Sequence, residues 1–85
     1  MGSQQKFKVE ILSAESTIYQ GEIDCLLVPS AKGQVAVLPF HAPMIIIMSE
    51  GDIFVILGRS KKKIATVKKG VVRVDDNEVF VLVNL

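Results

Sequence analysis

The sequence predicts an all-β domain, a two-layer β-sandwich or flattened barrel of about nine to ten short strands. Turn-forming residues recur at short intervals along the chain, and the runs between them are rich in Val and Ile, which is typical of strands. No window keeps the apolar spacing of an amphipathic helix. Short strands joined by tight turns favour two packed sheets over one open sheet.

The first half of the chain contains four predicted strands. Apolar residues alternate with Lys8 and Glu10 in the first of them, so one face of that strand should meet water. Gly21 separates the second strand from the third, and the Ser30–Gly33 turn separates the third from the fourth. The strands expected from these breaks are Lys6–Leu12, Thr17–Gln20, Glu22–Pro29 and Gln34–Leu38.

The second half begins with a stiff segment, Pro39–Pro43, because each proline restricts its own backbone and that of the residue before it. Arg59–Lys61 and Asp75–Asn77 have the composition of hairpin tips. The strands expected between these breaks are Met44–Ser49, Asp52–Gly58, Lys62–Lys68, Val71–Val74 and Glu78–Val83.

Two of these strands carry more apolar side chains than one core face can take. Met44–Met48 and Ile53–Leu57 are apolar at every position, although successive side chains of a strand point to opposite faces. One face of each run must therefore be covered. A loop or the amino-terminal strand is one candidate cover, and a permanent protein–protein interface is the other.

Strand alternation also predicts the core. Cys25 shares the parity of Ile23 and Leu27, which makes it a small buried hydrophobe rather than a reactive thiol. The expected core positions are Leu12, Ile23, Leu27, Val37, Leu38, Val72, Val79 and Val81.

Length and composition limit the possible functions. The chain has 85 residues with 49% hydrophobic and 22% charged residues, enough for one domain, which we expect over residues 6–85. Residues 1–5 read as a flexible leader or a cloning remnant without the features of a signal peptide. A net charge of +1 argues against a nucleic-acid binder, and no apolar run reaches the ~20 residues of a membrane helix.

No group of residues in the sequence assembles a catalytic or metal site. His41 is the only histidine and Cys25 the only cysteine, so neither has the partners that a metal ion or a catalytic base would need. Asp75 and Asp76 fit a turn better than a calcium loop. Lys61–Lys63 and Lys68–Lys69 fit a solvated strand edge, with an anionic membrane surface or an acidic partner as the alternative. We expect no enzyme activity, no cofactor and no tight nucleotide binding.

One series of motifs resembles a known family. In order they are Gly21-Glu22-Ile23, Val28-Pro29, Gly33, Val37-Leu38-Pro39 and His41-Ala42-Pro43-Met44. This series is similar to the amino-terminal β-sandwich of the epsilon subunit of F-type ATP synthase, which is called delta in mitochondria. The likeness runs from Phe7 to Val83, and its Leu-Pro-x-His-Ala-Pro element is the most specific part.

The resemblance implies a non-catalytic rotor subunit of the central stalk that holds the gamma subunit to the membrane c-ring and couples proton flow to ATP synthesis. It implies a peripheral position on the cytoplasmic face of the bacterial inner membrane, or the organellar equivalent, without direct membrane insertion. In the family a helical hairpin usually follows this domain, and this sequence ends at Leu85, where the hairpin would begin, either because the subunit is naturally short or because the chain is cut at the domain boundary. A free-standing β-sandwich adaptor or ligand-binding module is the alternative function.

Partner contacts are expected in two loops, which we predict to share one end of the sandwich. The sequence departs from the family at Phe40, where Gly or Asn is usual, and at Gln34, where an acidic residue often stands. Phe40 and Met44 should dominate affinity, because burial of a large apolar side chain contributes about 1.5–3 kcal/mol. The predicted contact residues are Lys32, Gly33, Gln34, Phe40, His41 and Met44.

Overall fold

The computed structural model describes residues 5–85 and contains nine strands over that range. Residues 1–4 of the predicted leader lie outside the described residues. The strands are β1 (Phe7–Leu12), β2 (Thr17–Ile23), β3 (Cys25–Ser30), β4 (Gly33–Val37), β5 (Met44–Met48), β6 (Gly51–Leu57), β7 (Ser60–Val67), β8 (Lys69–Asp75) and β9 (Glu78–Asn84). No helix within these residues has the length and hydrophobicity needed to cross a membrane.

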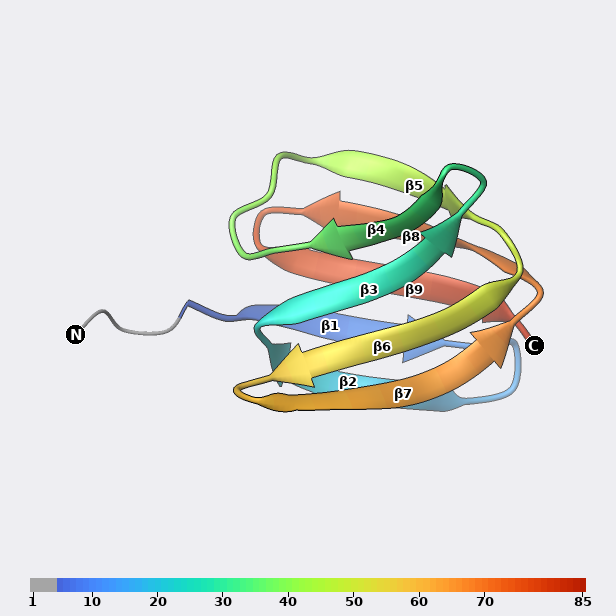
Figure 1. Ribbon diagram of the computed structural model, residues 1–85, viewed down its shortest axis with the longest axis horizontal. Helices are drawn as coiled ribbons and strands as arrows, with labels where there is room; N and C mark the ends of the chain where they lie inside the picture. The colour runs from blue at the N-terminus through green and yellow to red at the C-terminus, as the bar shows by residue number, and fades with distance from the viewer. Residues whose placement is uncertain (1–4) are drawn as a thin grey trace.

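The strands form two facing layers that are joined at one corner (Figure 1). The hydrogen-bonded order is β2-β1-β9-β8-β5-β3-β6-β7, with β4 added to β3. One layer contains β5, β8, β9, β1 and β2, and the other contains β4, β3, β6 and β7 (Figure 1). The Ser30–Met48 pair joins β3 to β5, while β2 and β7 approach each other on the opposite side. The predicted sandwich or flattened barrel is therefore confirmed.

The break between the second and third strands lies at Asp24, not at Gly21 as predicted. Gly21 continues β2 and pairs with Val9 of β1. The chain bends at Asp24, whose carboxylate accepts a hydrogen bond from the Gly58 backbone N–H at 2.6 Å and pairs with the Lys6 ammonium at 2.9 Å. These bonds tie the β2–β3 bend to the β6–β7 hairpin tip.

The core lies between the two layers and is built almost entirely from aliphatic side chains. Ile23, Val37, Val72, Val79 and Val81 are buried, as predicted. Its other members include Phe7, Val9, Ile11, Leu26, Val28, Ile53 and Val67.

Three core predictions need correction. Leu38 is 53% exposed, because β4 ends at Val37 and the following loop turns away from the core. Leu27 and Leu12 are only half-buried. Strict alternation from Ile23 would point Leu27 toward the core. The bend at Asp24 changes which side chains point inward, so Leu26 is buried instead.

Gly70 lies where three strands come unusually close. It pairs with Met48 of β5 and with Val83 of β9. A β-carbon at this position would overlap the Leu82 carbonyl oxygen and the terminal methyl of Met48. The absence of a side chain at Gly70 therefore permits the close packing of β5, β8 and β9.

Candidate functional site: an apolar sheet face and a strained loop

The outer face of the β5-β8-β9 sheet is apolar and open to water. Met44, Ile46 and Met48 of β5 point toward the core, so alternation sends Ile45 and Ile47 outward, where they are 65% and 67% exposed. Ile47 pairs with Val71, which pairs with Leu82. We call Ile45, Ile47, Val71 and Leu82 the outer apolar face.

This face has a hollow and a charged border. The hollow is shallow, and Ile47, Gly70, Val71 and Leu82 are among the residues that line it. Toward the other end of the same sheet, Asp75 of β8 lies opposite Glu78 of β9 in the strand register. The Arg73 side chain forms an ion pair with the Asp75 carboxylate at 3.3 Å. An apolar surface beside a polar border is the usual anatomy of a protein–protein interface.

The second apolar run is largely covered, in contrast to β5. Ile53 and Val55 of β6 are buried, while Phe54 and Ile56 are half-buried. The Lys61 ammonium lies 4.6 Å from the centre of the Phe54 ring, so the lysine side chain shields that ring from water. Of the two runs, only β5 presents a strongly exposed apolar side within the described residues.

The loop between β4 and β5 holds a strained aromatic residue. Phe40 has φ 59°, a left-handed conformation that bulky residues rarely adopt, and its side chain is 67% exposed. Its backbone N–H donates a hydrogen bond of 2.7 Å to Asn77 Oδ1 in the β8–β9 turn. Asn77 Nδ2 in turn donates to the Lys6 carbonyl oxygen at 2.9 Å. Asn77 therefore ties the loop to β1 and to the β8–β9 hairpin.

The two loops predicted to share one end of the sandwich lie at opposite ends. Strand β4 separates them, and its five residues span about 16 Å. Figure 1 shows the β3–β4 turn at one end and the β4–β5 loop at the other. Lys32, Gly33 and Gln34 are exposed at the first of these ends, braced by Ser30, whose hydroxyl donates to the Gly33 carbonyl at 2.8 Å. The predicted contact residues therefore form two separate groups, with Phe40, His41 and Met44 at the second end.

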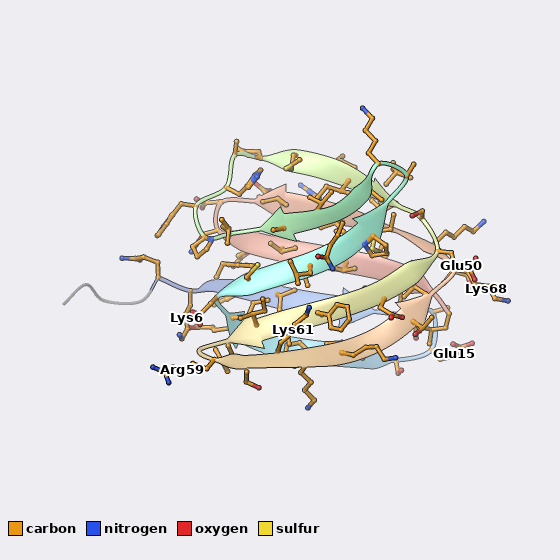
Figure 2. All side chains as sticks on the ribbon, viewed as in Figure 1. Lys6, Glu15, Glu50, Arg59, Lys61 and Lys68 are labelled. Carbon is orange, nitrogen blue, oxygen red and sulfur yellow. The ribbon has the colours of Figure 1, made fainter. Side chains whose placement is uncertain are left out.

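Charged side chains border both ends of the molecule. Figure 2 shows Lys6 and Arg59 at the end near the β6–β7 tip, and Glu15, Glu50 and Lys68 at the end near the β3–β4 turn. The labelled side chains at the first end are both positively charged, whereas those at the second end carry both signs. The lysines Lys61–Lys63 lie on β7, a terminal strand of the hydrogen-bonded order, as a solvated edge would require.

Met44 and His41 differ from the exposed Phe40. Met44 is half-buried and packs against the core, so a charge introduced there would disturb the fold as well as any partner contact. His41 is also half-buried, with Nδ1 3.1 Å from the carbonyl oxygen of Ala42.

The buried Cys25 thiol has a raised pKa, because burial disfavours its charged form and the nearby Asp24 charge adds to the effect. Within residues 5–85, no three His, Cys, Asp or Glu side chains cluster as metal ligands would.

Sequence reasoning missed the outward residues of β5 and β9. It placed Val79 and Val81 in the core, so strict alternation already assigned Phe80 and Leu82 to the outer side. The signal for Ile45 and Ile47 was weaker, because a strand that is apolar at every position does not reveal which side faces the core. Asn77 was recognised as a turn residue, but its bond to Phe40 crosses 37 positions and had no sequence signal.

Comparison with known proteins places this sandwich in a family. The family model for the ATP synthase delta/epsilon chain β-sandwich domain matches residues 6–85. The chain belongs to this family. The match covers the residues that carry the resemblance noted in the sequence, which confirms that resemblance.

Curated relatives of this ATP synthase domain family are named ATP synthase epsilon chain. One from Leptospira interrogans is 36% identical over 80 residues, which cover 94% of this chain and 62% of that relative. One from Neisseria meningitidis is 32% identical over 79 residues, which cover 92% of this chain and 56% of that relative. The chain thus spans about 62% of the length of the first of these relatives.

Solved structures with the same fold come from mitochondrial ATP synthases. A chain of the Euglena gracilis assembly described as OSCP/F1/c-ring gives a TM-score of 0.85 at 16% identity, with 98% of this chain and 53% of that chain covered. A chain of the Tetrahymena thermophila central stalk/c-ring assembly gives 0.76 at 14% identity, with 99% and 67% covered. At these identities the likeness establishes the fold.

Proposed function

We propose that this chain is a non-catalytic rotor subunit of the central stalk of a proton-translocating F-type ATP synthase. It binds the gamma subunit and the membrane c-ring, and so helps to couple proton flow to ATP synthesis. It is a peripheral component on the cytoplasmic face of the bacterial inner membrane, or on the equivalent organellar face. Membership in the delta/epsilon family supports this function over a free-standing adaptor or ligand-binding module.

The outer apolar face is the observation that carries the proposal. Large aliphatic side chains on one sheet are exposed although the core beneath them is complete. A contiguous apolar surface of this kind is typical of a protein–protein contact site. A protein that works by holding other subunits together needs such a surface and needs no catalytic group.

The chemistry of the outer apolar face and of the β3–β4 turn suggests how the partners are divided. Ile45 and Ile47 offer an apolar surface, which suits extensive packing against the gamma subunit. The β3–β4 turn offers Lys32, Gly33 and Gln34, all exposed, which suits the polar loops of a c-ring. The predicted contacts at His41 and Met44 would then fall on the gamma side, next to the start of β5.

The proposal is tested by placing a charge on the outer apolar face. Ile47→Asp should leave the domain folded, because the side chain is 67% exposed. It should weaken binding to the purified gamma subunit by about tenfold or more, since complex formation would bury an unpaired carboxylate. Calorimetry measures the affinity, and far-ultraviolet circular dichroism checks the fold.

Leu57→Asp is the matched control, because Leu57 is exposed at the end of β6 in the other layer. It should change the affinity by less than about twofold. If the wild-type chain does not bind the gamma subunit, the proposed function is wrong. If wild type and Ile47→Asp bind equally well, the assignment of gamma to the outer apolar face is wrong.

A further inference from the structure

Phe40 combines two features that are each unfavourable in the isolated chain. Its backbone is left-handed at φ 59°, which costs free energy for a residue with a bulky side chain. Its ring is 67% exposed, so it contributes little to the core in return. Asn or Gly at this position would adopt the same backbone at lower cost. Within this chain alone, the aromatic side chain therefore has no stabilising role that explains it.

The surrounding structure holds this conformation in place. The Phe40 N–H donates to Asn77 Oδ1 at 2.7 Å, and Asn77 is itself fixed by its bond to the Lys6 carbonyl at 2.9 Å. Pro39 and Pro43 restrict the backbone on either side. The ring is thus presented to solvent on a braced loop, which reduces the entropy that binding would cost.

The loop is also free of charge. Leu38–Pro43 contains no ionisable side chain other than His41, and Leu38 is exposed along with Phe40. The carboxylates of the adjoining β8–β9 hairpin, Asp75, Asp76 and Glu78, lie outside this loop, and Asp75 is paired with Arg73. The loop leads directly into β5, whose outward residues begin with Ile45. The loop is therefore an uncharged apolar projection that stands beside the charged border of the outer apolar face, where Ile45 pairs across the strands with Arg73.

We propose that Phe40 is a pre-organised aromatic anchor that inserts into an uncharged apolar pocket of the gamma subunit and determines specificity for it. This inference rests on the proposed function, because gamma is the occupant of the adjoining face. The c-ring is assigned to the β3–β4 turn, which lies at the opposite end of the sandwich from the β4–β5 loop that carries Phe40. Buried aromatic side chains are among the most frequent dominant residues of protein interfaces.

The test exploits the opposite effects that the substitution should have on stability and on binding. Phe40→Asn removes the ring and places a residue that tolerates positive φ, so the melting temperature should rise by about 2–5 °C. The affinity for the purified gamma subunit, measured by calorimetry, should fall by about tenfold or more. A residue with a purely structural role would not give a more stable domain that binds less well.

Leu57→Asn is the control, because it removes another exposed apolar side chain near the same end of the sandwich. Its affinity for gamma should stay within about twofold of wild type. If Phe40→Asn binds gamma as tightly as wild type while Ile47→Asp does not, the anchor role is overturned and the proposed function stands. If the wild-type chain fails to bind gamma, both are overturned. A fall in melting temperature for Phe40→Asn would also overturn the inference, because Phe40 would then stabilise the fold.

Discussion

The side chain of Asn77 accepts a hydrogen bond from the backbone N–H of Phe40 at 2.7 Å, although 37 positions separate the two residues. Because Asn77 also bonds to the Lys6 carbonyl and accepts from the Lys8 N–H at 3.3 Å, one turn residue fastens three separate segments. The strained loop, the amino-terminal strand and the β8–β9 hairpin are therefore coupled in stability.

Removing the Asn77 side chain should destabilise the domain. Asn77 has φ 62°, so Asn77→Gly keeps the turn and tests the side-chain bonds alone. The free energy of unfolding in urea should fall by about 1–3 kcal/mol, because two backbone groups lose their partners. Asp76→Gly is the control, since Asp76 shares the turn and the positive φ but makes no comparable bond. Equal stability of the two variants would contradict the fastening role.

Truncation of Leu26 should destabilise the domain far more than truncation of Leu38. Leu26 is fully buried, so Leu26→Ala should lower the free energy of unfolding by about 2–5 kcal/mol. Leu38 is exposed, so Leu38→Ala should stay within about 0.5 kcal/mol of wild type. Urea titrations followed by circular dichroism measure both. A large loss from Leu38→Ala would mean that the β4–β5 loop buries Leu38 against the core.

The stabilising contribution of Asp24 should be lost in acid. The Gly58 N–H, and then Lys6, lower the pKa of the Asp24 carboxyl below its usual value. A carboxyl with a lowered folded-state pKa stabilises the fold above its unfolded pKa, and this contribution is lost as the pH falls through the folded pKa. The stability difference between about pH 7 and about pH 3 should therefore be smaller in Asp24→Asn than in wild type. An unchanged difference would show that the bonds to Asp24 add nothing to stability.

Gly70 should not tolerate even one methyl group. Because a β-carbon there would overlap backbone of β9, Gly70→Ala should cost about 1–3 kcal/mol of stability. Gly21→Ala is a matched control within a strand, since its β-carbon would meet only Tyr19 at 3.6 Å. That variant should be neutral or more stable by about 0.4–1 kcal/mol. Thermal melts of the two proteins should therefore shift in opposite directions, and a shared direction would contradict the packing described around Gly70.

Much of the fold was predictable because the evidence for it is local. Turn residues such as Asp76 and Asn77 require particular backbone angles, and alternation along β8 and β9 separates buried from exposed positions. The prediction failed where a contact distant in sequence decided the outcome. The bend at Asp24, which is held by bonds to Lys6 and Gly58, moves burial from Leu27 to Leu26.

The candidate site, like the fold, was predictable only in part. The amino-acid sequence alone determined the all-β class, the excess of apolar residues in Met44–Met48 and the family motifs, because composition and period are properties of neighbouring residues. Only the tertiary structure decided that Ile45 and Ile47, rather than Met44, face water, and that Phe40 and Lys32 lie at opposite ends. The physical reason is that an unbroken apolar strand packs equally well with either side inward until its register with neighbouring strands is set.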